Sequence, residues 1–422
     1  MVMHIVIFLL RRAIYPMDHR KYHPWLICFT VSLFFLYVFL QMNALNAISV
    51  DLIKAYNLSN TGLGILSASY LLALALFFLP VGILLDHFSI RYMILIGMGL
   101  EILAVFLFAM APNLLIAILA RFVCGGIHAL AFLACLRLAS RWLPQRLGLA
   151  IGMIVTIGMV GGLLAQLPFT LLLHILQWRW VFIVLGIIGI GFWGLFAFII
   201  YDNPSMPMAD RPSHSVLSEL GQVITSSQNW LCALYASLLN LPLILLGALW
   251  GTLYLTHETG LNTTQAAWVL SMIYLGLMIG SPVVGWISDR IPSRKKPMIL
   301  GALFSLILIC LIFFACHLSF YMLLILFLSL SVMTSAQVLS YPTISESNLP
   351  SVESTSLGFA SIIIMGGGAV AQPLFGWLVE HGVPSFQRIF GFNSYHAAFF
   401  IIPLGLLCSL IISTFIEETK AS

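Results

Sequence analysis

Three ionisable side chains lie inside apolar stretches of the sequence, where a charge is costly to bury. Arg121 and His128 share one such stretch, and Glu101 lies in the stretch before it. Residues seven apart in a helix fall on the same face, so Arg121 and His128 share a face with Gly125 between them. That face could bind a carboxylate or a phosphate. Ionisable residues at such depth in an apolar segment indicate a functional site.

Proton transfer is the second chemistry that these residues allow. Glu101 is the only carboxylate near the middle of an apolar stretch, and it reaches a depth similar to that of Arg121, so a buried ion pair is feasible. Glu101 is therefore either a proton-coupling site or the neutralising partner of Arg121, and the sequence favours neither. Histidine changes charge near neutral pH, which suits coupling at His128, although a simple hydrogen-bonding role remains open.

The composition indicates that the segments carrying these residues are surrounded by lipid. Hydrophobic residues make up 61% of the 422 residues, charged residues only 8%, and the mean hydropathy is +1.07. A span needs about 20 apolar residues to cross a bilayer, and in lipid it must be helical because its backbone has to satisfy itself. We predict an all-α membrane protein with twelve spans, at residues 25–48, 61–85, 91–111, 113–138, 147–174, 178–201, 229–256, 264–287, 297–316, 319–342, 354–379 and 396–416.

The spans divide the chain into two six-helix bundles, residues 25–201 and 229–416. A polar linker at 202–228 separates them, and short segments at 1–24 and 417–422 complete the chain. With the N-terminus in the cytoplasm, fourteen of the eighteen lysines and arginines face that side, which predicts that both termini are cytoplasmic. The apolar start of the chain does not have the order of a signal peptide, and translation from Met17 is an alternative.

One polar motif occurs twice at the same place in each bundle. Residues 82–91 and 285–294 both read Gly-x-x-x-Asp-(His/Arg)-x-x-x-Arg, between the second and third spans of their halves, and each is preceded by a Ser-x-x-Tyr-Leu, at 67–71 and 271–275. Two six-span halves that each carry this loop resemble the major facilitator superfamily. Carboxylates at helix ends bind arginines and helix N-termini, so these loops predict a latch between the halves on the cytoplasmic side. Its expected members are Asp86, Arg91, Asp289, Arg290 and Arg294. The alternative is that these charges only end helices and fix topology.

The resemblance also implies where a solute binds. In that superfamily the first, fourth, seventh and tenth helices line a central cavity, and the fourth carries a similar arginine followed by glycine. Polar and aromatic residues gather on the matching spans here, and core packing is the competing interpretation for each of them. The expected binding residues are Arg121, His128, Gln41, Asn43, Asn240, Trp250, Tyr254, Gln337 and Tyr341.

We therefore expect a secondary transporter that works by alternating access. Proton-coupled symport of a small anionic or zwitterionic solute, such as an amino acid, peptide, nucleoside or organic acid, is favoured. The alternatives are an efflux antiporter for an amphipathic compound and a membrane sensor built on the carrier fold. The sequence has no nucleotide-binding loop, paired catalytic carboxylates or zinc motif. We expect no enzymatic activity, cofactor, metal or nucleic-acid partner, and a monomer in a bacterial inner membrane.

Overall fold

The computed structural model describes residues 24–201, 216–291, 293–315, 318–349, 352–382 and 394–419, without the side chains at 86, 87, 144, 216–220 and 354. The expected N-terminal segment before residue 24, most of the linker and the end of the tail lie outside these residues. So does the side chain of Asp86. Every described element is a helix of the α, 3-10 or π type.

The first half contains six spans in chain order. They are α2 (Pro24–Asn43), α4 (Asn60–His87), α5 (Ile90–Met110), α6 (Leu114–Trp142), α7 (Leu147–Leu164) continued by α8 (Leu167–Leu173), and α9 (Trp178–Ile199). Two short helices, α3 (Ser49–Tyr56) and η2 (Pro144–Arg146), connect spans. The first span ends at Asn43, earlier than the expected residue 48, because residues 44–48 form turns.

The second half repeats this order after the short helix α10 (Val216–Thr225). Its elements are α11 (Ser227–Leu239), η3 (Pro242–Trp250), α12 (Gly251–Glu258), α13 (Thr263–Arg290), α14 (Lys295–Phe314), α15 (Phe320–Thr334), η4 (Ser335–Leu339), α16 (Ser340–Ser347), α17 (Glu353–His381), α19 (Ser394–Phe399) and α20 (Ile401–Phe415). Eleven helical segments of the described chain are long and apolar enough to cross a membrane. A twelfth is the pair 227–239 and 242–258, bent by 42°. The predicted all-helical membrane fold is confirmed.

The bend in the seventh span has a local cause. Proline lacks a backbone N–H and clashes with the preceding turn, and Pro242 begins η3 directly after the end of α11 at Leu239. From Pro242 to Trp250 the helix has the wider π form. Widened turns of this kind leave carbonyl oxygens to bond elsewhere, which is why they are frequent at functional sites.

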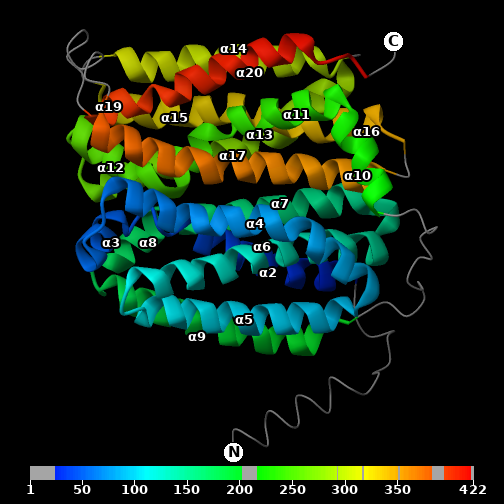
Figure 1. Cartoon of the computed structure of the whole chain (residues 1–422), viewed down its shortest axis with the longest axis horizontal. Coiled ribbons are helices and arrows are strands. Elements are labelled where there is room, and N and C mark those ends of the chain that lie inside the picture. The colour runs from blue at the N-terminus through cyan, green and yellow to red at the C-terminus, as the bar shows by residue number, and fades with distance from the viewer. Residues whose placement is uncertain are drawn as a thin grey trace, which may run out of the picture.

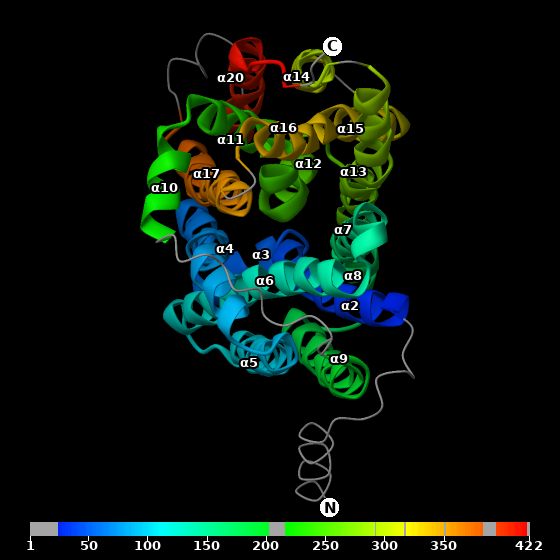
Figure 2. The same cartoon turned by 90° about the vertical axis from the view of Figure 1, so that its right-hand side faces the viewer.

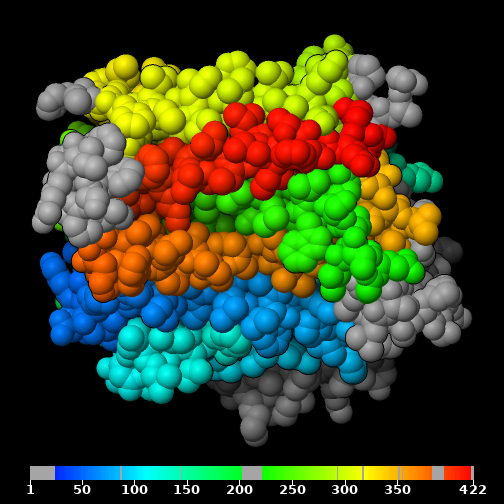
Figure 3. Space-filling model, turned by 45° about the horizontal axis from the view of Figure 1, so that its top comes forward, coloured from blue at the N-terminus to red at the C-terminus, as the bar shows by residue number. Residues whose placement is uncertain are grey.

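The two halves lie side by side, with their helices roughly parallel to one long direction (Figures 1 and 2). Helices α3 and α12 lie at one end of the molecule, called the α3 end below. Helices α10 and α16 lie at the opposite end, called the α10 end. The space-filling view shows α17 (orange) along α4 (blue) at the junction of the halves (Figure 3).

Glycine lets the backbones of α4 and α17 touch. A Cβ atom added to Gly64 would lie 2.7 Å from the carbonyl oxygen of Gln372, and one added to Gly376 would lie 2.4 Å from that of Asn60. Each glycine thus belongs to one half and faces the backbone of the other. A larger residue at either position would push the halves apart at the α3 end.

Candidate functional site

Arg121 lies buried in α6, with only 1% of its surface exposed. Its Nη1 donates to the carbonyl oxygen of Gln41 at 2.8 Å, and its Nη2 donates to that of Met42 at 3.4 Å. The guanidinium also lies over the ring of Tyr70, 4.4 Å from its centroid. These groups stabilise a cation, because carbonyls at a helix C-terminus and an aromatic face both carry partial negative charge. None of them neutralises it.

His128 lies two turns along α6 and is joined to the same tyrosine. The Tyr70 hydroxyl and His128 Nδ1 are 2.8 Å apart, and the hydroxyl also donates to the carbonyl oxygen of Val38 at 2.9 Å. Phe35 and Phe39 of α2 pack edge-on against the imidazole ring. Arg121, Tyr70 and His128 therefore form one buried cluster, which we call the Arg121 cluster, between α2, α4 and α6.

Glu101 is fully buried in α5, in electrostatic range of Arg121 and beside Cys124. Among the described residues, its carboxylate oxygens accept no hydrogen bond from a nitrogen or oxygen donor, the thiol of Cys124 is the neighbouring donor, and Nε of Arg121 has no partner. The two side chains do not form the ion pair that their similar depth made feasible. An ionised carboxylate without hydrogen bonds is costly to bury, so Glu101 is a position where proton binding has a large energetic effect.

Two other arginines of the first half bind helix ends in the same way. Arg91 donates to the carbonyl oxygen of Ala197 at 2.7 Å and stacks on Tyr201. Arg179 donates to the carbonyl oxygens of Ala109 and Ala111 and stacks on the ring of Trp178. Both lie close to the ends of spans, in the first turns of α5 and α9. Arg121 lies deeper in its span, because more than one full turn of α6 extends on either side of it.

A second polar group joins the halves at the bend of the seventh span. Asn46 Nδ2 donates to the carbonyl oxygens of Leu246 and Gly247, both at 2.9 Å, and its Oδ1 accepts from the backbone N–H of Thr252 at 2.9 Å. Gln166, in the break between α7 and α8, donates to the carbonyl oxygen of Gly247 at 3.0 Å. Two carbonyls of the π turn are thus bound by side chains of the other half, and that of Leu246 also accepts the backbone N–H of Gly251.

Tyr274 of α13 extends this group toward the Arg121 cluster. Its hydroxyl donates to Asn43 Oδ1 at 2.7 Å and accepts a 3.4 Å bond from Gln166. Its ring packs edge-on against Phe39, which in turn packs against His128. The inter-half hydrogen bonds between described residues all lie from the α3 end to this depth. We call Asn43, Asn46, Gln166 and Tyr274 the gate group.

Of the remaining expected binding residues, Gln41 contacts the Arg121 cluster through its backbone carbonyl, and Trp250 and Tyr254 make their contacts in the second half. Trp250 is fully buried, donates to the carbonyl oxygen of Gln372 and stacks on Phe375. Tyr254 stacks on Phe399, with ring centroids 4.1 Å apart. Both contacts are packing within the second half. The side chain of Gln41 lies near Tyr37, and that of Tyr341 lies near Ser361. Asn240 Oδ1 has no hydrogen-bond partner among the described residues, and Gln337 lies in η4.

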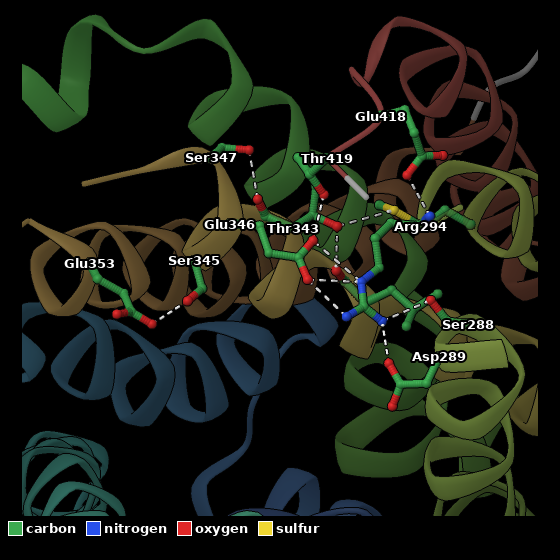
Figure 4. Close-up of polar contacts among 12 residues, drawn as sticks. Ser288, Asp289, Arg294, Thr343, Ser345, Glu346, Ser347, Glu353, Glu418 and Thr419 are labelled. Atoms are coloured by element: carbon green, nitrogen blue, oxygen red, sulfur yellow. Dashed lines mark hydrogen bonds and ion pairs between the residues drawn. The ribbon is translucent and has the colours of Figure 1, made fainter. Parts of the chain in front are cut away.

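The second copy of the repeated loop binds its own half (Figure 4). Arg294 pairs with Asp289 and with Glu346 of α16, both at 2.8 Å, and its backbone N–H donates to Glu418. Glu346 raises the pKa of Arg294, so the guanidinium stays charged. Arg290 stacks on Trp286, 4.0 Å from its ring. In the described residues these charges tie α13 to α16 and the tail.

Tyr70 and Tyr274 are not among the predicted site residues, although both belong to a motif that the sequence repeats. They occupy the same place in the two Ser-x-x-Tyr-Leu repeats. Each tyrosine binds α2, through the carbonyl of Val38 or the side chain of Asn43. The repeat indicates duplication. Its one polar aromatic residue also marks the site.

Comparison with known proteins identifies the family. The sequence model of the Major Facilitator Superfamily matches residues 30–254 and 241–422. The chain belongs to this superfamily of transporters. A solved D-xylose-proton symporter has the same fold, with a TM-score of 0.76 and 16% identity over 93% of this chain and 98% of that one.

Two curated members are similar in sequence. The D-galactonate transporter of Escherichia coli O6:H1 is 25% identical over 292 residues, which cover 61% of this chain and 67% of that protein. The membrane sensor protein UhpC of Salmonella typhimurium is 23% identical over 300 residues, 66% of this chain and 68% of that protein. The described residues contain no group of three or more histidines, cysteines or carboxylates that could hold a metal.

Proposed function

We propose that this superfamily member is a proton-coupled symporter of a small organic anion. The observation that carries the proposal is the charge of Arg121. Its contacts among the described residues are neutral carbonyls and an aromatic ring, and no carboxylate forms an ion pair with it. A cation at this depth is stabilised most by an opposite charge, and a solute carboxylate would supply one.

A sugar acid or a similar organic acid is the substrate class we favour. The similarity to a D-galactonate transporter supports a carboxylate, and the polar gate group above Arg121 supports hydroxyl groups on the solute. Amino acids and short peptides also carry a carboxylate and form the next class. Nucleosides do not, and they are the weakest of the classes considered.

Glu101 and His128 are the proposed proton-coupling residues. Glu101 is buried beside the Arg121 cluster and accepts no hydrogen bond from a nitrogen or oxygen donor of the described residues, and His128 belongs to the cluster through its contact with Tyr70. A proton on Glu101 and a solute anion beside Arg121 would each change the field at the other. That mutual effect is the basis of coupling.

We place the chain in a bacterial inner membrane with the α10 end in the cytoplasm. The distribution of lysine and arginine supports this orientation. The inter-half hydrogen bonds near the α3 end then correspond to a carrier closed on the outer side. Breaking the gate group would be part of the step that opens it outward.

Transport assays in proteoliposomes test the proposal. Uptake of labelled D-galactonate, glutamate, dialanine and uridine is measured with and without an inward proton gradient. We expect a carboxylate to accumulate only when the gradient is present. Equal uptake with and without the gradient at every pH would remove the coupling claim, and selective uptake of uridine would remove the anion claim.

A non-transporting sensor is the second candidate, favoured by the similarity to UhpC. It predicts specific binding of a solute without net flux. The same liposomes distinguish the two, because a sensor binds the labelled solute in equilibrium dialysis and yet leaves the liposome lumen empty. The efflux alternative is tested by reversing the gradient and following release from preloaded liposomes.

A further inference from the structure

Two contacts at the α3 end join the halves in the same manner. Glu380, in the last turn of α17, accepts hydrogen bonds from the backbone N–H and the hydroxyl of Thr61 at 2.7 and 2.6 Å. His174, directly after α8, forms a hydrogen bond through Nε2 with the hydroxyl of Thr264 at 3.1 Å. In both, a titratable side chain at the end of one helix binds the first turn of a helix in the other half.

The duplication relates these two contacts. Thr61 is the second residue of α4 after its cap Ser59, and Thr264 is the second residue of α13 after its cap Asn262. The two threonines are 203 positions apart, from 61 to 264, the same offset as the repeated loops. The partner helices also correspond, because α7 with α8 is the fifth span of its half and α17 is the fifth of the other.

Protonation acts on both contacts in the same direction. The N-terminus of a helix carries partial positive charge, which attracts a carboxylate and repels an imidazolium. A proton on Glu380 therefore removes an attraction to α4. A proton on His174 adds a repulsion to α13. Both contacts are exposed, so protons from the solution at the α3 end reach them.

Few other charged groups of the described residues lie near Glu380. On its own helix His381 follows it, bonded to the carbonyl oxygen of Trp377. From α19 come Tyr395, bonded to Asn60, and His396, which pairs with Glu258 of α12. The first two turns of α4 bring no titratable residue.

Among the described residues, His174 has fewer charged neighbours than Glu380. Arg179 of α9 is the nearest along the chain, and carbonyls of Ala109 and Ala111 hold its guanidinium. Neither α8 nor the first two turns of α13 bring a titratable residue.

We propose that Glu380 and His174 are paired, acid-sensitive latches that hold the α3 end closed and release it when they are protonated. Protonation adds a charge to the imidazole and removes one from the carboxylate, so acid weakens both contacts with the positive helix N-termini. The latches concern opening of the α3 end and hold whatever solute is carried, so failure of the symport proposal leaves them intact.

Distance measurements on the whole chain in lipid nanodiscs test the latches. Spin labels are attached through p-acetylphenylalanine at Ala55 of α3 and at Tyr321 of α15, which keeps the native cysteines; both positions are exposed. The open fraction is read from double electron–electron resonance at pH 8 and at pH 5. We expect the open-to-closed ratio to rise about two- to five-fold in acid, from the effect of one charge at a helix end.

Variants separate the two latches. Glu380→Gln should raise the ratio by a similar factor already at pH 8, and His174→Gln should reduce the rise between pH 8 and pH 5. Thr263→Val changes the exposed residue next to Thr264; it is the control and should behave as the unmodified chain. An unmodified chain that does not respond to pH, a Glu380→Gln variant that stays closed, or a His174→Gln variant with the full response overturns the proposal.

Discussion

The hydroxyl of Tyr274 donates a 2.7 Å hydrogen bond to Asn43 across the junction of the two halves. Asn43 is the last residue of α2, and the two preceding carbonyls of the same helix bind Arg121. The end of α2 therefore has two tasks. Its carbonyl oxygens bind the guanidinium of Arg121, and the side chain of Asn43 binds Tyr274 of the second half. A movement that releases Tyr274 acts on the same helix end that positions Arg121.

Replacing Tyr274 by phenylalanine should favour opening at the α3 end. The ring and its contact with Phe39 remain, while the bonds to Asn43 and Gln166 are lost. A hydrogen bond contributes about 1 kcal/mol, which corresponds to a roughly five-fold shift in the open-to-closed ratio. The measurement is the same label distance between α3 and α15. Tyr235→Phe, which loses a bond to Met298 within one half, is the control, and an equal shift there would contradict the assignment.

Gly162→Ala should prevent closure at the α3 end. A Cβ atom at Gly162 would lie 2.3 Å from Cε1 of Tyr274, closer than real Cβ contacts come. The halves would have to separate there, and transport should fall to background with the protein still folded. Gly152→Ala in the same helix has open space around its Cβ and should keep full transport. Normal transport by Gly162→Ala would show that this contact is not required.

Glu101→Gln should separate proton coupling from solute movement. The amide is close in shape to the protonated acid but cannot release a proton, so accumulation driven by a proton gradient is lost. Exchange of labelled for unlabelled solute across the liposome membrane should persist. Asp51→Asn, in the first turn of α3, serves as the control. If Glu101→Gln still accumulates solute, the proton site moves to His128, and His128→Gln becomes the test.

Arg294→Ala should destabilise the second half. The arginine holds Asp289 and Glu346 together, and its side chain is only 11% exposed. Hydrogen bonds to charged groups contribute about 2 kcal/mol. Because the hydrogen bonds from Glu346 raise the pKa of Arg294 above its unfolded value, the contribution is complete below the unfolded pKa and is lost only in strongly alkaline solution. The loss of thermal stability should therefore be equal at pH 6 and pH 9, and a loss confined to one pH would contradict the pairing.

The spans could be predicted from sequence because apolar length is enough to define them. The two helix breaks near the site, at residues 44–48 and in the seventh span, are harder to predict. Pro242 is present in the sequence, but no sequence pattern marks Asn46 and Gln166 as partners of the carbonyls of the π turn. Residues 44–48 are predicted to belong to the first span, whereas the structure has turns there.

The candidate site was predicted in part for a similar reason. The depth of Arg121 follows from counting residues, whereas its partners are backbone carbonyls, which every residue has. Trp250 and Tyr254 were expected at a binding site because of their type, and their contacts are stacking partners that only the fold reveals. The roles of Tyr70 and Tyr274 depend on which half each one faces. The repeated motif is the same around both, so the sequence does not distinguish their roles.

Binding of a carboxylate to Arg121 is the central claim, and one comparison tests it most directly. Arg121→Ala and Arg179→Ala both remove an arginine that binds helix carbonyls, so both should cost stability. Isothermal titration of each purified variant, with the carboxylate that the liposome assay identifies, then measures affinity. We predict that Arg179→Ala binds as the unmodified protein does and that Arg121→Ala shows no binding. Normal binding by Arg121→Ala would contradict the account.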